Sequence, residues 1–296
     1  MEFIQALKAY PALWLGTAAL VGLCVGSFLN VVIHRLPRMM EAQWRAECAA
    51  LAGSGPEAAP EAAPEAAPPP YNLLRPASRC PSCSAPIRPW QNIPVVSWVA
   101  LRGRCANCHA PISFRYPAVE IAAGALAVLM AWRFGATGAG VLAMVFAWAL
   151  LALTFIDLDT QLLPDDITLP LLWLGRLANA FGAFTALRSA VFGAAGGYLI
   201  LWLVYWGFRL VANKEGMGFG DFKLLAALGA WGGWQVLPMI VLVSAGTGAI
   251  IGGFLLWRSK SGTDTRIPFG PYLALGGLAA LLWGRQAMIA WIGYFP

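Results

Sequence analysis

Residues 138–159 read GAGVLAMVFAWALLALTFIDLD, so an uncharged stretch at 138–156 runs directly into Asp157 and Asp159. A helix needs about 20 apolar residues to cross the hydrocarbon core of a bilayer, so this stretch predicts a transmembrane helix that ends in two carboxylates. Of the 296 residues, 59% are apolar and 11% are charged, whereas about 25% of residues are charged in soluble domains. The sequence therefore predicts an all-α polytopic membrane protein and excludes an ordinary soluble domain.

Further apolar stretches bring the predicted number of transmembrane helices to about eight. The stretch nearest the N-terminus is expected to be a retained helix. It is not expected to be a cleaved signal, because Glu2 and Lys8 make a poor basic flank and the apolar run is too long. The sixth stretch is short for a span. We expect helices near 12–33, 117–132, 138–156, 167–186, 190–211, 222–235, 237–257 and 270–294.

The placement of the basic residues predicts the topology. If the N-terminus lies outside, residues 35–115 and the joints after the third, fifth and seventh helices lie inside. These inner segments then hold fifteen of the twenty Lys and Arg residues, against three outside. This asymmetry follows the positive-inside rule. We therefore interpret the net charge of +6 as a sign of membrane orientation, and we expect a lipid bilayer but no nucleic acid among the partners.

One insertion, residues 36–116, interrupts the helices. Within it, residues 51–70 read LAGSGPEAAPEAAPEAAPPP. This repeat is too rich in proline and too poor in apolar side chains to form a core, so a semi-stiff linker is expected. The predicted organisation is a first transmembrane helix at 1–35, a cytoplasmic linker at 36–70, a cysteine-bearing segment at 71–116 and a helical membrane domain at 117–296.

Two Cys-x-x-Cys turns lie in the cysteine-bearing segment, at Cys80–Cys83 and Cys105–Cys108. Four thiolates satisfy a tetrahedral zinc ion and leave no open position, so a structural zinc site is expected. Disulfides or a redox pair are the alternatives, but a cytoplasmic segment stays reduced and no thioredoxin-like pattern surrounds either turn. His109 is a possible substitute ligand. We expect the two remaining cysteines, Cys24 and Cys48, to be ordinary thiols.

Five of the six aspartates cluster at two joints, which the predicted topology places at the same membrane face. The first joint carries Asp157, Asp159, Asp165 and Asp166, and the second carries Asp221. Two carboxylates brought together share one proton, because like charges a few ångströms apart resist joint ionisation. Such a pair hydrolyses a peptide bond without metal, since one carboxylate takes a proton from water while the other polarises the carbonyl.

Each aspartate also has an interpretation in which it takes no part in catalysis. Asp165 and Asp166 follow a proline and precede an apolar run, as an N-cap and a first-turn acid do. Asp157 and Asp159 can simply mark the point where a helix reaches water, and the sixth aspartate, Asp264, lies in a polar joint. Asp221 follows two glycines, at 218 and 220, that allow close backbone approach of a substrate, although a Gly-x-Gly-Asp pattern alone is weak.

Taken together, these motifs resemble the bacterial prepilin peptidases, which are membrane-embedded Gly-x-Gly-Asp aspartyl proteases. The resemblance covers nearly the whole chain. It rests on Gly26-Ser-Phe-Leu-Asn-Val-Val-Ile-His-Arg-Leu-Pro37, the two Cys-x-x-Cys turns, Arg102-Gly-Arg-Cys105, Ile112-Ser-Phe-Arg-Tyr-Pro117-Ala-Val-Glu120, the Asp157 joint with Leu163-Pro-Asp165, and Gly218-Phe-Gly-Asp221-Phe-Lys-Leu224.

This resemblance implies a site and an activity. The family's catalytic pair falls on Asp157 and Asp221, and its metal-binding residues fall on Cys80, Cys83, Cys105 and Cys108. The family removes a short basic leader from type IV prepilins and type II secretion pseudopilins at the cytoplasmic face of the bacterial inner membrane. Many members then methylate the new N-terminus with S-adenosylmethionine, and a member with the cysteine-bearing segment resembles those two-activity enzymes.

Several points stay open at the level of sequence. The chain shows no glycine-rich Rossmann turn, so the methyl-donor activity rests on the resemblance and its site residues are unknown. The Ala-Pro-Glu linker departs from the family as an insertion. Asn30, near the inner end of the first helix, is expected either to bond another helix or to support the site. Two other functions compete: a transporter with ion- or proton-binding carboxylates, and a zinc-knuckle membrane anchor that binds a cytoplasmic partner.

Overall fold

The structure is a computed structural model of the whole chain. It describes residues 5, 7, 9–53, 71–213, 217–259 and 268–292. Most of the Ala-Pro-Glu linker and Asp264 lie outside the described residues. By internal contacts the chain divides into two compact units, Leu23–Ala122 and a second unit that joins Met1–Gly22 to Ala123–Pro296. Each unit is considered by itself.

Within the described residues, every element is a helix, and eight of these helices correspond to the eight predicted stretches. The predicted fold class, an all-α polytopic membrane protein, is confirmed. The elements are α2 (Pro11–Gly53), η1 (Pro89–Asn92), α3 (Val96–Ala100), α4 (Arg115–Phe134), α5 (Gly138–Thr160), α6 (Asp165–Ala180), α7 (Leu187–Ala212), α8 (Phe219–Gly232), η2 (Trp234–Val236), α9 (Leu237–Ser259) and α10 (Gly270–Ile292).

Five of the described helices are long and apolar enough to cross a membrane. They lie at Pro11–Ala52, Arg115–Phe134, Gly138–Thr160, Leu187–Ala212 and Trp234–Phe254, and α10 contributes a shorter apolar stretch, Gly270–Gly284. The helices α6 and α8 have 16 and 14 residues. At a rise of 1.5 Å per residue, α8 is only about 21 Å long, which is less than the hydrocarbon core of about 30 Å.

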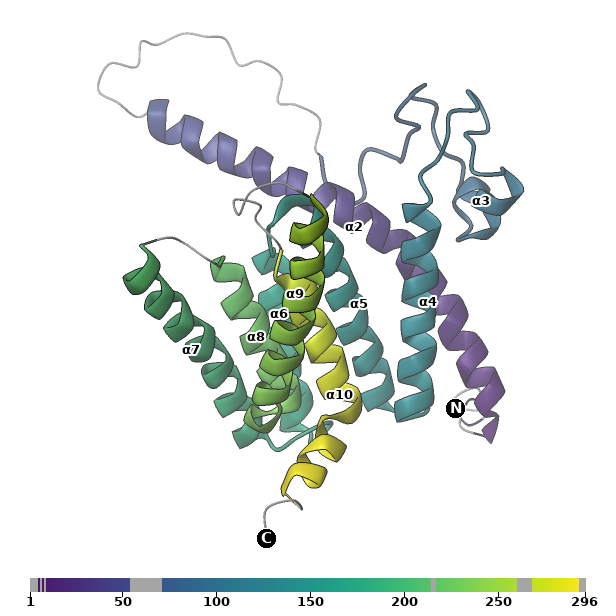
Figure 1. Cartoon of the computed structure of the whole chain (residues 1–296). Coiled ribbons are helices and arrows are strands. Elements are labelled where there is room, and N and C mark those ends of the chain that lie inside the picture. The colour runs from purple at the N-terminus through teal and green to yellow at the C-terminus, as the bar shows by residue number, and fades with distance from the viewer. Residues whose placement is uncertain are drawn as a thin grey trace. The chain divides into compact units, whose positions relative to one another are not determined.

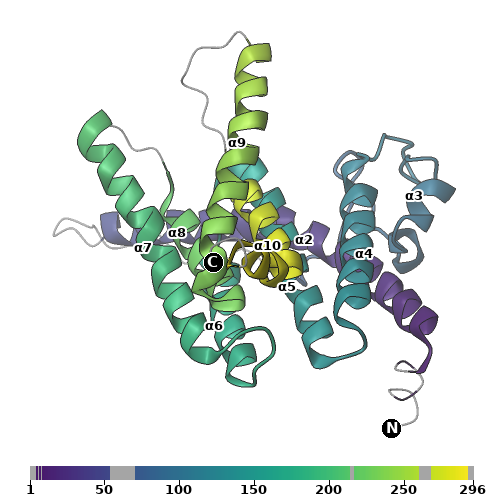
Figure 2. The same cartoon turned by 60° about the horizontal axis from the view of Figure 1, so that its bottom comes forward.

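The larger unit is a bundle in which consecutive helices run in alternate directions, as Figures 1 and 2 show for α5 to α10. The end of α5 and the starts of α6, α8 and α10 consequently share one end of the bundle. The short helix α8 contacts α6, α7, α9 and α10. Its Trp231 is fully buried and donates a hydrogen bond from Nε1 to the Leu171 carbonyl oxygen at 2.8 Å. Protein thus surrounds α8, and lipid does not set its length.

Glycines allow α7 and α8 to pack at backbone contact, as small residues commonly do between membrane helices. A Cβ atom on Gly193 would collide with the Gly229 carbonyl group, and one on Gly197 would lie 2.5 Å from the Leu225 carbonyl oxygen. On α6, a Cβ on Gly175 would collide with the ring of Trp231. The helix that carries Asp221 is therefore held closely on two sides.

The smaller unit contains the second part of α2, the cysteine-bearing segment and the start of α4. The helix α2 continues well beyond residue 33, because residues 39–53 are rich in Ala, Glu, Gln and Met, which favour helix. The buried guanidinium group of Arg35 donates to the carbonyl oxygens of Asn72, at 3.0 Å, and Pro76, at 2.8 Å. It also lies 5.8 Å from the centre of the Tyr71 ring. These contacts attach the start of the cysteine-bearing segment to α2.

Candidate active site and metal cluster

Asp157 lies in the last turn of α5 and its side chain is 4% exposed. The backbone N–H of Gly270, the first residue of α10, donates a hydrogen bond to Asp157 Oδ2 at 2.8 Å. A Cβ atom on residue 270 would lie 2.6 Å from the same oxygen, so only glycine fits here without displacing the carboxylate. The position of Asp157 therefore depends on a contact 113 residues away in the sequence.

Asp221 lies in the first turn of α8, after the N-cap residue Gly218. Its backbone N–H donates to the Gly218 carbonyl oxygen at 3.2 Å, and the residue is 7% exposed. The side-chain atom Oδ1 is buried and has no hydrogen-bond partner. Asp157 is close enough to Asp221 for the two carboxylates to repel each other when both are ionised. The fold thus brings together the two aspartates that the family resemblance identifies.

Leu163 connects the two aspartate joints. A Cβ atom on Gly220 would lie 2.8 Å from Leu163 Cβ, and one on Gly270 would lie 3.1 Å from Leu163 Cδ2. Gly220 therefore makes room for a side chain of this protein, which is a different role from the close approach of a substrate suggested by its sequence context. A Cβ on Gly218 would meet only Asp221 Oδ2, at 3.8 Å, and the backbone of residue 220.

The other acids of the first joint are exposed. Asp165 and Asp166 lie in the first turn of α6, as predicted, but Asp165 also forms an ion pair. Lys223 Nζ lies 2.8 Å from Asp165 Oδ1 and 2.7 Å from Asp165 Oδ2. This pair joins the start of α6 to the start of α8, two residues after Asp221.

The four cysteines of the two turns form a cluster in which all sulfur atoms lie within 4.8 Å of one another. A tetrahedral zinc site with Zn–S bonds of about 2.3 Å has S–S edges of about 3.8 Å. The Sγ atoms of Cys80 and Cys108 are 3.8 Å apart. The donor set and spacing therefore fit a tetrahedral metal ion, and His109 is not part of the cluster.

The two turns have the same backbone structure. The N–H of Cys80 bonds the Ala85 carbonyl oxygen at 3.0 Å, and the N–H of Cys105 bonds that of Ala110 at 2.9 Å. The signal for this repeat is present in the sequence, because Arg-Cys-x-x-Cys-x-Ala-Pro-Ile occurs at 79–87 and again at 104–112.

Asn107 supports the cluster from outside. Its side-chain amide donates to Cys83 Sγ at 3.5 Å, and its backbone N–H donates to Cys105 Sγ at 3.4 Å. The bond from the Asn107 side chain is the main cause that lowers the pKa of Cys83 to about 6. Backbone bonds from Cys108 and Asn107 lower the pKa of Cys105. Both effects favour the thiolate, the form in which cysteine binds metals.

Two polar residues of the smaller unit take structural positions. Asn30 Nδ2 donates to the carbonyl oxygen of Tyr116 at 3.1 Å. This is a helix-to-helix bond, the first of the two roles predicted for Asn30. The buried Glu120, whose role the sequence does not indicate, accepts a hydrogen bond from the Val95 backbone at 2.7 Å.

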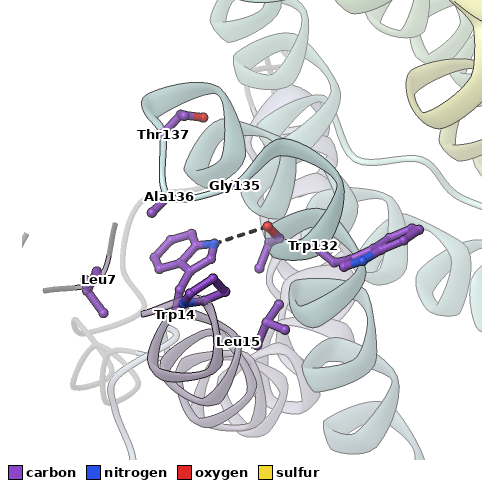
Figure 3. A pocket seen from close by; sticks show the side chains of 9 residues that line it. Leu7, Trp14, Leu15, Trp132, Gly135, Ala136 and Thr137 are labelled. Carbon is purple, nitrogen blue, oxygen red and sulfur yellow. Dashed lines mark hydrogen bonds between the residues drawn. The ribbon is translucent and has the colours of Figure 1, made fainter. Parts of the chain in front are cut away.

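A pocket of about 310 Å³ lies in the larger unit, at the end of the bundle opposite the aspartates. Its lining includes Trp14 and Trp132, and Trp14 Nε1 donates to the Ala131 carbonyl oxygen at 3.2 Å (Figure 3). None of its lining residues is titratable, so the pocket offers no group for acid–base chemistry.

Comparison with known proteins agrees with this arrangement. Residues 20–134 match the model of the bacterial peptidase A24 N-terminal domain, and residues 144–253 match that of the type IV leader peptidase family. A prepilin leader peptidase/N-methyltransferase of Pseudomonas aeruginosa is 52% identical over 97% of this chain and 96% of its own length. Proteins of the same name are 50% identical in Stutzerimonas stutzeri, over 99% of both chains, and 52% identical in Aeromonas hydrophila, over 95% and 94%.

No solved structure matches the chain. The relatives, however, cover nearly its full length at about half identity. The resemblance inferred from the sequence motifs is therefore confirmed, and neither a transporter nor a zinc-knuckle anchor is favoured. This chain belongs to the type IV leader peptidase family.

Proposed function

We propose that this protein is an aspartyl endopeptidase in which Asp157 and Asp221 share one proton and cleave the leader of type IV prepilins or type II secretion pseudopilins. One observation carries the proposal. Two nearly buried carboxylates from helices far apart in sequence lie close enough to repel each other, and one of them has a buried oxygen without a partner. Burying two acids together is costly unless they share a proton.

The hydrogen bonds support a division of roles between the two aspartates. The N–H of Gly270 points at Asp157 Oδ2 and stabilises a negative charge there, so Asp157 is the ionised base. Asp221, whose Oδ1 receives no such bond, holds the proton. Asp157 then takes a proton from water, the water oxygen attacks the scissile carbonyl carbon, and Asp221 gives its proton to the carbonyl oxygen. As the tetrahedral intermediate collapses, one of its hydroxyl groups returns a proton to Asp221, the C–N bond breaks, and the proton on Asp157 goes to the leaving amine.

The substrate and the membrane face follow from the family and the charge distribution. The relatives are named prepilin leader peptidases, which supports prepilins as the substrate class. The positive-inside rule supports a cytoplasmic position for both aspartate joints, and the family resemblance supports the bacterial inner membrane as the location. Both joints lie at one end of the helical bundle, as this topology requires. A short basic leader in the cytoplasm would then reach the dyad from the side where it is made.

The relatives' name also supports a second activity, methylation of the newly exposed N-terminus. S-adenosylmethionine would supply the methyl group, and we assign no residue of this chain to its binding. Incorporation of labelled methyl from S-adenosylmethionine into a cleaved prepilin-like peptide tests the activity. A peptide that is cleaved but stays unlabelled would limit the protein to proteolysis.

We further propose that the cysteine cluster holds one structural zinc ion through Cys80, Cys83, Cys105 and Cys108. The sulfur spacing fits a tetrahedral site, and the four thiolates fill all four of its positions. Because neither turn has a core of its own, the ion would hold the two together.

The protease proposal is tested with a prepilin-like peptide and purified protein in detergent. Asp157→Asn and Asp221→Asn each remove proton transfer while keeping the size of the side chain, so each should lower cleavage by several orders of magnitude. The double variant should be little worse than either single one, because the two groups act as a unit. Asp166→Asn, at an exposed position in the first turn of α6, is the matched control and should cleave normally.

Asp159→Asn should mainly raise KM, because this exposed acid lies two residues from Asp157 and is expected near the basic leader. If Asp159→Asn abolishes turnover while Asp157→Asn remains active, the dyad is misassigned. Normal cleavage by all three variants would exclude the protease mechanism.

A further inference from the structure

The segment 71–116 carries the whole excess positive charge of the protein. It contains six arginines and no acidic residue, while the rest of the chain holds equal numbers of basic and acidic residues. A zinc ion held by four thiolates would remove only two of these charges. Five of the six are exposed, and two of these, Arg88 and Arg102, lie on either side of α3. This distribution favours an anionic surface as the neighbour of the segment.

Four large apolar side chains are exposed between these two arginines. They are Trp90, at 59% exposure, Ile93, at 48%, and Val96 and Val99, each at 61%. We name these four residues the apolar ridge. The guanidinium group of Arg88 lies 5.3 Å from the centre of the Trp90 ring, so charge and aromatic surface occur side by side. Exposed apolar groups of this density are unfavourable in water, so another phase or molecule is expected to cover them.

One hydrogen bond fixes the depth of the ridge relative to the membrane span α4. The N–H of Val95 donates to Glu120 Oε2 at 2.7 Å. Glu120 lies five residues after Arg115, the first residue of the 20-residue span α4. At 1.5 Å per residue α4 is about 30 Å long, which matches the hydrocarbon core, and Glu120 lies about 7 Å from its start. The backbone of residue 95 is therefore held about 7 Å inside this end of the span, in the outer part of the lipid leaflet.

The local backbone is strained in order to make this contact. Val95 has φ +60°, a value that β-branched residues very rarely adopt, and its N–H bond to Glu120 holds it there. On the other side of α3, Trp98 Nε1 donates to the Ile112 carbonyl oxygen at 3.2 Å. Two hydrogen bonds thus attach α3 beside the start of α4 and leave the ridge on its exposed side.

From these observations we propose that the apolar ridge inserts into the lipid leaflet and that Arg88 and Arg102 bind anionic lipid headgroups. The ridge is then an interfacial anchor of the kind in which apolar side chains enter the leaflet by about 5–10 Å while basic residues stay at the headgroups. Lipid is favoured as the occupant because the bond between Val95 and Glu120 holds the ridge beside the first turns of a helix that is long and apolar enough to cross the membrane. Its flanking charge is also complementary to an anionic leaflet.

The test uses the full-length protein in vesicles of phosphatidylcholine and phosphatidylglycerol whose acyl chains carry bromine, which quenches nearby tryptophan fluorescence. Subtracting the tryptophan fluorescence of Trp90→Phe from that of the wild type gives the fluorescence of Trp90 alone. Trp132→Phe is the matched control, since Trp132 is 71% exposed and lies two residues from the other end of α4. Both rings should be quenched more by bromine near the headgroups than by bromine deep in the chains.

Lipid selectivity is measured in the same vesicles. At equal mole fraction, brominated phosphatidylglycerol should quench Trp90 more than brominated phosphatidylcholine, because each arginine near an anionic surface enriches the anionic lipid by roughly fivefold. The double variant Arg88→Gln, Arg102→Gln should abolish this preference and keep the depth of Trp90. If brominated lipid leaves Trp90 unquenched while it quenches Trp132, the ridge is in water or covered by protein, and the proposal is wrong. Equal quenching by the two lipids would overturn the anionic preference.

Discussion

Gly270→Ala tests whether the start of α10 positions the carboxylate of Asp157. The added Cβ would lie 2.6 Å from Asp157 Oδ2, whereas ordinary van der Waals contact begins at 3.4 Å. The same methyl group would lie 3.1 Å from Leu163 Cδ2, so it has little room on that side. We therefore expect the carboxylate to shift by about 0.8 Å and its bond from the N–H of residue 270 to lengthen.

The expected loss follows from the sensitivity of catalysis to geometry. A displacement of about 1 Å in a reacting group costs about a hundredfold in rate, so kcat should fall between about tenfold and a hundredfold. This corresponds to about 1.4–2.7 kcal/mol in the activation free energy. KM should change little, because Gly270 contacts the base and not the leader. Glycine at this site thus acts through its backbone and through its lack of a side chain.

The assay is initial-rate cleavage of a prepilin-like peptide, with thermal unfolding in detergent as the measure of folding. Gly246→Ala is the matched control, since a Cβ on this glycine of α9 would meet nothing within 4 Å. It should keep both kcat and the unfolding temperature. Wild-type kcat in Gly270→Ala would refute the argument. A lowered unfolding temperature with unchanged kcat would assign Gly270 to packing alone.

Four other outcomes are expected. Cys80→Ser should lose bound zinc, measured as zinc per purified chain. A wild-type protein with less than about half an equivalent of zinc per chain would contradict the zinc site. Asn179→Ala should lower stability in detergent by at least about 2 kcal/mol, because two carbonyl oxygens in the last turn of α8 and two N–H groups in the loop after α6 lose their partner; an unchanged unfolding temperature would contradict this. A reporter fused after Lys214 should be active only in the cytoplasm, and external activity would reverse the topology. Asn30→Ala should lower stability by about 1 kcal/mol and leave the cleavage rate per folded molecule unchanged; a slower rate at unchanged stability would assign Asn30 to the site.

The acids of the site could be nominated from the sequence because charged residues are scarce in this chain. Counting spans between Asp157 and Asp221 places both at one membrane face without any knowledge of packing. The roles of Gly270 and Leu163 could not be inferred in this way, because a backbone N–H and a methyl-sized gap leave no chemical signature in a sequence. Those contacts depend on how α10 packs against α5, which hydropathy does not specify.

Helix length was the other limit of the sequence analysis. Hydropathy marks where a chain leaves lipid, and α2 leaves it long before its helical residues end at Gly53. At the opposite extreme, the stretch predicted at 222–235 includes Gly233, whose φ of +87° ends α8 after 14 residues. The backbone preferences of the local residues determine where α2 and α8 end, whereas the apolar composition of the flanking residues does not.

The shortness of α8 has a consequence for how the protein is made. A helix of about 21 Å cannot cross the bilayer alone, so the insertion machinery has little reason to release it into lipid as an independent segment. Its glycine contact with α7 offers a partner that is synthesised just before it, across the joint at 213–218. We expect α7 and α8 to enter the membrane as one helical hairpin. The carboxylate of Asp221 would then be carried into the membrane already shielded from lipid.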